Sequence, residues 1–213
     1  MVIREYGQYC GLSRALELVG ERWALLVIRD LLVGPKRFSE LQRGLAKIPS
    51  NILTSRLKEL EEAGIVQRRA QPRPASGSVY ELTAAGRGLE EAVIALGRWG
   101  AQHLGDIRTG EIITDDSMTM ALRSIFRPEA AADCDAAFEL HVGDVVVNAT
   151  VRDGAVTVHK GSLESPDLVI EGGPKIRALL AGEISPAEAL RSGAARVHGK
   201  RALFGRFIQL FRI

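Results

Sequence analysis

Polar side chains able to donate and accept hydrogen bonds gather on one face of a helix predicted over residues 51–63. At about 100° per residue, the leucines of this segment share a core face, with Arg56 at its margin: Leu53, Leu57 and Leu60. The opposite face carries an amide, two hydroxyls and an ammonium group, from Asn51, Thr54, Ser55 and Lys58. Such groups can bond base edges or phosphates. A plain amphipathic helix with a solvated face is the alternative.

A shorter helix is predicted just before this one. Ser39-Glu40-Leu41-Gln42 is a capping box that favours a helix start. Ile48-Pro49 then turns the chain, Ser50 is the predicted N-cap of the next helix, and Gly64 is its left-handed stop. Helix, turn and helix in this order are typical of a module that lays its second helix in the DNA major groove.

Two strands joined by a polar loop follow the second helix. The pattern predicts strands over residues 65–70 and 79–82, with a Pro/Gly/Ser loop over 71–78. Arg68, Arg69 and Arg73 lie on or beside this loop, in position for phosphate or minor-groove contact. Residues 36–83 therefore predict a winged helix-turn-helix. Its candidate DNA-contact residues are Arg37, Ser39, Ser50, Asn51, Thr54, Ser55, Arg56, Lys58, Arg68 and Arg73.

Positive charge is concentrated on this segment, although the whole chain has a formal net charge of only +2. Residues 36–73 hold nine Lys/Arg against four Asp/Glu, whereas residues 111–213 hold twelve against fourteen. Neutralising DNA phosphates requires such an excess, and a solvated surface is the alternative.

Three further helices are predicted around the module. Two precede it, over residues 9–19 and 23–32, and the second is apolar almost all round, as expected of a central core helix. Thr83 caps a long third helix running to about residue 104, with a stripe of large apolar side chains: Leu89, Val93, Leu96 and Trp99. This stripe predicts dimer packing with the first helix, or packing on the C-terminal region.

Several motifs in order resemble the HxlR family of bacterial transcriptional regulators. They are CGLSRALELVGERW (10–23), RDLLVGPKRFSEL (29–41), LTSRLKELEEAGIV (53–66) and VYELTAAGRGL (79–89). The resemblance spans residues 6–104. It implies a homodimer on a palindromic operator, with recognition helices roughly 34 Å apart and dimerisation by the terminal helices. It also implies that Asn51, Thr54, Ser55, Arg56 and Lys58 belong to the recognition helix.

Cys10 matches the N-terminal cysteine of that family, which senses oxidants or electrophiles in some members. A thiol near a helix start, with Arg14 one turn on, favours a lowered pKa. The alternative is a small buried apolar residue. Cys134 lies in the other half of the chain, and the two cysteines do not suggest a disulfide framework.

The second half changes from helical to strand periodicity. After a predicted linker over 106–115, Asp115 or Asp116 caps a helix reaching Phe126. Alternating apolar residues from Ala136 onward predict a three-strand antiparallel meander, with hairpin turns at Gly143-Asp144 and Asp153-Gly154. Strands over 167–171 and 195–198 follow, with a helix opened by Pro174, a second with the capping box 185–188, and a terminal apolar helix.

This order, with LVIEG, ALRSGAARVHGK and the last helix, resembles the sterol-carrier-protein fold over residues 116–213. The resemblance implies an α/β sandwich with an apolar tunnel, and a ligand such as an acyl chain or a sterol. The candidate ligand residues are Phe126, Phe138, Leu140, Leu179, Leu180, Phe204 and Phe207. A filled core is the alternative for each of them.

We therefore predict an α+β chain: residues 1–105 form a winged helix-turn-helix with a long dimerisation helix, and residues 116–213 form the carrier-like sandwich. No signal peptide, membrane span, metal-ligand spacing or catalytic motif is evident, so we expect a cytoplasmic protein that is not an enzyme and needs no cofactor. Its expected function is that of a homodimeric repressor, modulated by an apolar effector. The alternative is a lipid carrier whose winged helix serves dimerisation or protein contacts.

Overall fold

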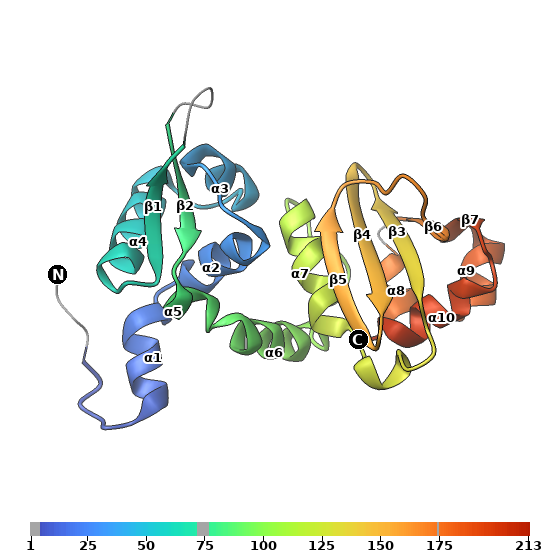
Figure 1. Ribbon diagram of the computed structural model, residues 1–213, viewed down its shortest axis with the longest axis horizontal. Coiled ribbons are helices and arrows are strands. Elements are labelled where there is room, and N and C mark those ends of the chain that lie inside the picture. The colour runs from blue at the N-terminus through green and yellow to red at the C-terminus, as the bar shows by residue number, and fades with distance from the viewer. Residues whose placement is uncertain (1–4, 72–76, 174) are drawn as a thin grey trace. The chain divides into compact units, whose positions relative to one another are not determined.

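The computed structural model describes residues 5–71, 77–173 and 175–213, and the chain divides into two compact units, Met1–Val93 and Ile94–Ile213 (Figure 1). The predicted first domain ends later, at residue 105. The division by packing falls earlier because the second half of helix α6 (Glu90–Ala101) contacts helix α7 (Asp115–Ile125): Arg98 Nε donates to the carbonyl of Ser124 at 2.8 Å.

The first four helices of the chain pack around one apolar core in the first unit. They are α1 (Gly11–Val19), α2 (Ala24–Val33), α3 (Phe38–Gly44) and α4 (Ser50–Glu62). Helix α2 lies at the centre, as its nearly uniform apolar character predicts, and contributes Val27, Ile28 and Leu31 to the core. Strands β1 (Val66–Ala70) and β2 (Ser78–Leu82) pair antiparallel, which confirms the predicted wing hairpin.

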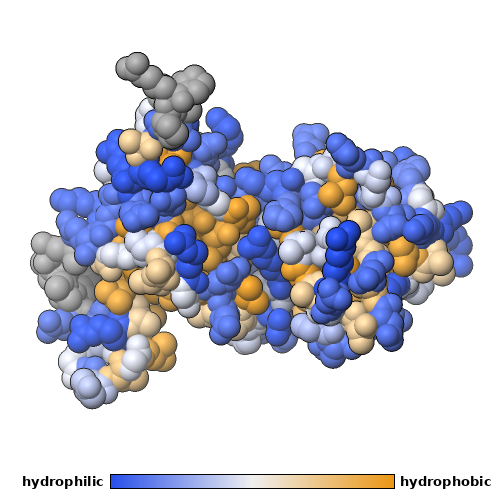
Figure 2. Space-filling model, viewed as in Figure 1, coloured by the Kyte–Doolittle hydropathy of each residue, from blue (hydrophilic) through white to orange (hydrophobic). Residues whose placement is uncertain are grey.

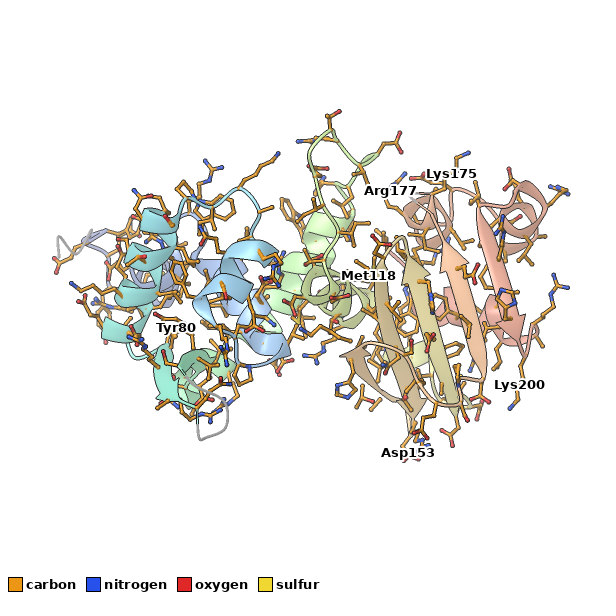
Figure 3. All side chains as sticks on the ribbon, turned by 90° about the horizontal axis from the view of Figure 1, so that it is seen from above. Tyr80, Met118, Asp153, Lys175, Arg177 and Lys200 are labelled. Atoms are coloured by element: carbon orange, nitrogen blue, oxygen red, sulfur yellow. The ribbon has the colours of Figure 1, made fainter. Side chains whose placement is uncertain are left out.

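The wing is extended by a short third segment. Lys36 and Tyr80 exchange both backbone hydrogen bonds, with N···O distances of 2.9 and 2.7 Å. Tyr80, which lies in β2, is labelled in Figure 3. The contact fixes the start of α3 against β2 and so connects the helices to the wing.

Two predicted helix caps are shifted. Helix α3 begins at Phe38 rather than Ser39, because Glu40 Oε2 accepts the backbone N–H of Arg37 at 2.6 Å. Ser50 is the first residue of α4, not its N-cap; Pro49 takes that place, since its fixed φ suits the entry to a helix. Gly64 has a φ of +67°, as expected for the left-handed stop.

The long helix predicted from Thr83 to residue 104 is interrupted. Thr83 caps the short helix α5 (Ala84–Arg87) by accepting the N–H of Gly86, and α6 begins only at Glu90. Gly86 lies so close to the strand entry that a Cβ there would be 2.2 Å from the carbonyl oxygen of Ile65. This close approach pins α5 to the wing, and a turn at Gly88 and Leu89 separates the two helices.

The second unit contains a five-stranded sheet in the order β5-β4-β3-β6-β7. The strands are β3 (Ala136–Val142), β4 (Val145–Arg152), β5 (Ala155–Lys160), β6 (Leu168–Gly172) and β7 (Ala195–Gly199). The predicted three-strand meander is confirmed, while β6 pairs parallel with β3. Both predicted hairpin turns are present. Asp153, labelled in Figure 3, and Gly154 have φ values of +49° and +74°.

Helices cover one face of this sheet (Figure 1). They are α7, α8 (Ile176–Leu180), α9 (Pro186–Ser192) and α10 (Leu203–Leu210), with a short 3₁₀ helix η1 (Pro128–Ala130) after α7. Thr114, not Asp115 or Asp116, caps α7, because its hydroxyl accepts the N–H of Ser117 at 3.1 Å. Ser185 caps α9 as predicted. The expected helix start at Pro174 lies outside the described residues.

Candidate nucleic-acid interface

Helix α4 has one buried face and one exposed face. Leu53, Leu57 and Leu60 are at most 1% exposed and belong to the core of the first unit. The exposed face carries the four polar side chains that the helical wheel selected, Asn51, Thr54, Ser55 and Lys58. The structure therefore brings these four side chains to one solvent-facing surface, as a helix that enters a DNA groove requires.

Two hydroxyl groups on this face are already engaged within the helix. Thr54 Oγ1 donates to the carbonyl of Ser50 at 2.9 Å, and Ser55 Oγ donates to Glu59 Oε1 at 2.9 Å. Each hydroxyl proton is therefore committed, while the oxygen lone pairs remain available as acceptors. In this state the two side chains are oriented to accept a hydrogen bond, for example from the amino group of a base.

Asn51 and Lys58 are the more available donors of the face. Lys58 Nζ lies 3.8 Å from Glu62 Oε1, one helical turn on, which at the surface is a weak ion pair. Among the described residues, the Asn51 side chain makes no hydrogen bond. Its amide can therefore offer a donor and an acceptor together, the combination that suits the edge of adenine.

Arg56 does not belong to the exposed face, which corrects the sequence-based assignment. The residue is 9% exposed, and its guanidinium pairs with Glu59 and lies 3.7 Å from Glu21 Oε2. These two carboxylates hold the side chain against the turn that follows α1. Because Glu59 also accepts the Ser55 hydroxyl, Arg56 connects that turn to the exposed face through one polar network.

The start of α3 is exposed and tied to the base of the wing. Arg37 Nη2 donates to Gln71 Oε1 at 2.7 Å, and the first turn also exposes Ser39. Ser50, at the start of α4, is exposed as well. These candidates share the solvent side of the helix-turn-helix, but Arg37 must release Gln71, or use its remaining N–H groups, to reach a phosphate.

Two of the wing arginines are held by neighbours across the hairpin. Arg68 Nε donates to Ser78 Oγ at 2.6 Å, and Arg69 Nε donates to Glu81 Oε2 at 3.0 Å. Hydrogen bonds from Gln67 and then Arg69 hold the pKa of Glu81 below its ordinary value. Arg69 is therefore neutralised by an ionised partner, whereas Arg68 keeps an uncompensated charge. Arg73 lies outside the described residues.

Two exposed cations were missed by the sequence-based selection. Arg43 lies in the last turn of α3, and Lys47 lies in the turn between α3 and α4. Both were counted in the positive charge of residues 36–73. Their position in a helix-turn-helix turn, beside the recognition helix, is the signal that would have singled them out.

Cys10 is an exposed thiol at the N-terminal end of α1. The backbone N–H groups of Ser13 and Leu12, followed by the Ser13 hydroxyl, stabilise its thiolate and lower the pKa of Cys10 from the ordinary 9.0. The expected alternative, a small buried residue, does not describe this cysteine. Cys134 by contrast is buried in the core of the second unit.

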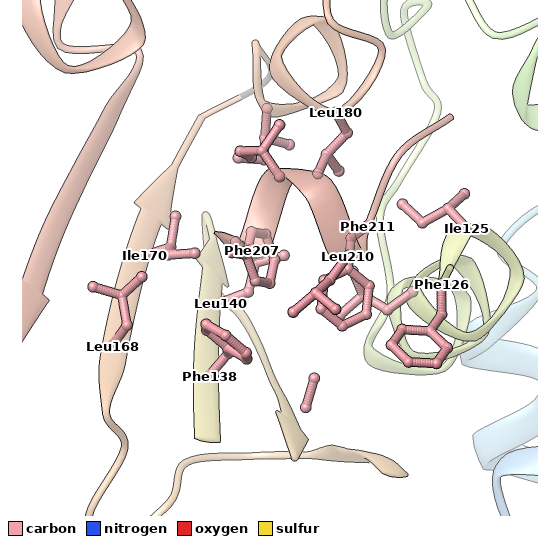
Figure 4. Packing of buried hydrophobic residues seen from close by; sticks show 14 of the residues in the cluster. Ile125, Phe126, Phe138, Leu140, Leu168, Ile170, Leu180, Phe207, Leu210 and Phe211 are labelled. Carbon is pink, nitrogen blue, oxygen red and sulfur yellow. The ribbon is translucent and has the colours of Figure 1, made fainter. Parts of the chain in front are cut away.

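The residues proposed to line an apolar tunnel lie in one continuous core (Figure 4). All seven are buried: Phe126, Phe138, Leu140, Leu179, Leu180, Phe204 and Phe207. The ring centroids of Phe138 and Phe207 are 5.2 Å apart, and those of Phe207 and Phe211 are 4.7 Å apart. At these separations the rings contact one another, so here side chains fill the interior. The filled-core alternative thus describes this cluster.

The comparisons with known proteins concern the N-terminal half. The model of the HxlR-like helix-turn-helix family matches residues 18–108. An uncharacterised HTH-type transcriptional regulator of Mycobacterium bovis is 45% identical over 92 residues, which are 43% of this chain and 58% of that protein. The HTH-type transcriptional regulator YodB of Bacillus subtilis is 36% identical over 91 residues, which are 43% of this chain and 81% of YodB.

A solved structure, the redox regulator HypR in its oxidized form, is 33% identical, with a TM-score of 0.42 over 46% of this chain and 100% of HypR. Of the Mycobacterium bovis relative, by contrast, the chain spans little more than half the length. The relatives are named transcriptional regulators.

The paired helices, the β-hairpin and the exposed second helix define a winged helix-turn-helix protein. With YodB matched over most of its length, the chain belongs to the HxlR-like helix-turn-helix family. Within the described residues, we find no helix with the length and apolar character needed to cross a bilayer.

Proposed function

We propose that the protein is a cytoplasmic transcriptional repressor that binds a palindromic operator as a homodimer. The observation that carries this proposal is the exposed face of α4, where Asn51 and Lys58 stand among solvent-facing hydroxyls while the leucines behind them fill the core. Asn51 and Lys58 are expected to act differently: the amide reads a base edge and the ammonium neutralises a phosphate. Arg37, Arg43, Lys47 and Arg68 add phosphate contacts around the helix.

A gel-shift titration against the DNA upstream of the protein's own coding region tests this function. Binding to the upstream fragment should exceed binding to scrambled DNA, and the affinity should fall steeply as the salt concentration rises. Each phosphate contact contributes a slope of about −0.9 to the plot of log affinity against log salt. Equal affinity for the two fragments at every salt concentration would contradict a sequence-specific regulator.

The proposed dimer rests on apolar side chains that the single chain leaves exposed. On α1 these are Leu12 and Leu16, and on α6 they are Leu96 and Trp99, with Leu12 and Trp99 69% and 61% exposed. Figure 2 shows apolar colour reaching the surface over α1. Large exposed apolar side chains on adjacent turns of a helix favour a protein partner, and a second copy is the partner proposed.

Cys10 is proposed as the site through which oxidants or electrophiles regulate DNA binding. The support is its exposure together with the lowered pKa, since the thiolate is the reactive form. Modification at the start of α1 would act on a helix that carries part of the proposed dimer surface. It would thereby change the geometry of the two recognition helices.

For the second unit we propose a sterol-carrier-like fold that takes an apolar effector. The five-stranded sheet with helices over one face is compatible with that sandwich. Because the rings of Phe207 and Phe211 contact each other within the candidate lining, an effector has to displace one of them to enter the core of the second unit. Adding acyl and sterol-like compounds to operator complexes tests this role, and unchanged affinity with every compound would argue against it.

The competing reading is a lipid carrier whose winged helix serves only dimerisation or protein contacts. It predicts co-purified apolar ligand and no sequence-specific DNA binding. The exposed polar face of α4 favours the regulator, because charged residues are depleted at the core of protein–protein interfaces, whereas an exposed amide and ammonium group suit contact with DNA.

A further inference from the structure

A pocket on the second unit is lined by two arginines that no proposed function uses. Its lining residues are Arg127, Glu129, Ala130, Gln209 and Arg212, and its volume is about 280 Å³. The lining comes from the segment that leaves α7, from η1, and from the end of α10. Two chain segments far apart in sequence therefore meet at this place.

A short antiparallel contact between these segments sends both arginines to the same side. Phe126 and Phe211 pair as a β-bridge, with the N–H of Arg127 donating to Leu210 at 2.8 Å and the N–H of Arg212 donating to Ile125 at 3.1 Å. Both phenylalanine rings point into the core, with centroids 5.6 Å apart (Figure 4). Since successive side chains of extended backbone alternate, Arg127 and Arg212 face outward together.

The guanidinium groups at the pocket are not neutralised by the protein. Among the described residues, neither Arg127 nor Arg212 has a side-chain hydrogen bond or ion pair, and Glu129 pairs with neither of them. Gln209 Oε1 accepts from Arg206 at 3.4 Å, which leaves the amide N–H groups of Gln209 as donors. The lining of the pocket thus includes two arginines without a described partner, an amide donor and a single carboxylate.

The position of Arg212 depends on a glycine. At Gly182, where φ is +74°, a Cβ atom would lie 2.7 Å from Nη2 of Arg212. The guanidinium therefore packs directly against the backbone at the end of α8, in space that any side chain would take. This contact restricts the Arg212 side chain, which lowers the entropy that the side chain loses when it binds a ligand.

From this geometry we propose that the pocket binds a small organic anion that carries a carboxylate or a phosphate. Planar guanidinium forks match both groups through paired, charge-assisted hydrogen bonds. Glu129 adds an acceptor, which favours an anion that also carries a hydroxyl or an amine. The volume is at the small end for ligand pockets, so it suits a group of a few heavy atoms rather than a long apolar molecule.

Calorimetric titration of the full chain at low ionic strength tests the site with four probes. Inorganic phosphate and glycerol phosphate form one pair, and acetate and lactate form the other, so that each pair compares an anion with a hydroxylated relative. Binding by the phosphate pair alone, by the carboxylate pair alone, or by both supports an anion site and identifies its chemistry. No probe binding with a Kd below about 10 mM would overturn it.

Substitutions at the pocket distinguish binding at this specific site from nonspecific attraction of anions to other positively charged side chains. Arg127→Gln and Arg212→Gln should each weaken the best probe by about 10-fold, the loss of a charge-assisted hydrogen bond. Glu129→Gln should reduce the advantage of the hydroxylated probe. Arg152→Gln, an exposed arginine at the end of β4 in the same unit, is the matched control and should leave every Kd unchanged. Equal weakening by Arg152→Gln would contradict the proposal.

Discussion

At the scale of single residues, what separates the polar side chains of α4 is their partners rather than their type. Asn51 and Lys58 keep groups available for a ligand, Ser55 is turned toward Glu59, and Arg56 is drawn inward between two carboxylates. Helix α4 thus carries both the side chains proposed to contact DNA and the arginine whose ion pairs orient the helix. Substitution of Arg56 is therefore expected to affect stability, and substitution of Lys58 is expected to affect DNA binding.

Replacing Arg56 by Met should lower the stability of the first unit. The substitution removes a guanidinium that is buried between Glu21 and Glu59, with an expected loss of about 1–3 kcal/mol. Lys58→Met, at an exposed position, should change stability by no more than about 0.5 kcal/mol and weaken DNA binding instead. Urea titration followed by Trp23 fluorescence, in a Trp99→Phe background, measures the first effect. Unchanged stability with weaker DNA binding in Arg56→Met would return Arg56 to the DNA-contact set.

Cys10 should react with an alkylating reagent at a lower pH than an ordinary thiol. Because its thiolate is stabilised, the fraction ionised rises earlier as the pH increases, and the rate should reach half its maximum at a lower pH than in the denatured protein. Stopped-flow alkylation across pH measures the midpoint, with denatured protein as the reference. Ser13→Ala removes one of the three stabilising hydrogen bonds and should move the midpoint upward. A native midpoint equal to the denatured one would contradict the assignment.

At the scale of elements, the frame around the wing depends on one close backbone approach. Gly86→Ala should destabilise the first unit by about 1–3 kcal/mol, since its Cβ would meet the carbonyl oxygen of Ile65 at 2.2 Å. Gly100→Ala, in α6 with no atom within 4 Å of the added Cβ, should be neutral or stabilising by up to about 1 kcal/mol. Amide hydrogen exchange in β1 and α4 measures the difference. Equal protection in both variants would show that α5 is not pinned by this contact.

The sequence predicted most elements because their buried faces repeat at fixed intervals. Three leucines fix the rotation of α4, and alternating residues identify the meander with both of its turns. The break between α5 and α6 was missed, although Gly86 and Gly88 are weak local signals for it, because the close approach of Gly86 to Ile65 is a tertiary contact. The cap of α7 was misplaced by one or two residues because Thr114, Asp115 and Asp116 are all good capping residues.

The site was predicted less completely, for two physical reasons. The helical wheel placed Arg56 at the margin of the leucine face, but it carries no information about Glu21, a residue 35 positions earlier in the chain, so Arg56 stayed among the DNA-contact candidates. Apolar periodicity likewise cannot separate the lining of a tunnel from a filled core, and the ring contacts of Phe207 decide that question only in three dimensions. The pocket at Arg127 and Arg212 depends on a bridge between distant segments and was not predicted at all.

At the scale of the whole molecule, the proposed function requires two copies of the chain. Leu96→Glu should shift the sedimentation mass toward that of a single chain, because it places a charge within the proposed apolar interface on α6. Ala95→Glu, also exposed on α6 but turned by about 100° from Leu96, is the control and should stay dimeric. A wild-type chain that sediments as a monomer at all concentrations would contradict the dimer.

The central claim is that the exposed face of α4 reads DNA, and a competition titration of two α4 variants tests it most directly. Operator fragments with single base changes are titrated with the wild type, Asn51→Ala and Lys58→Ala. Lys58→Ala should weaken binding to all fragments alike and reduce the salt slope by about 1, whereas Asn51→Ala should relax the preference at one base position, by about 1–3 kcal/mol. If both variants bind every fragment as the wild type does, the reading surface lies elsewhere and the account of this helix is wrong.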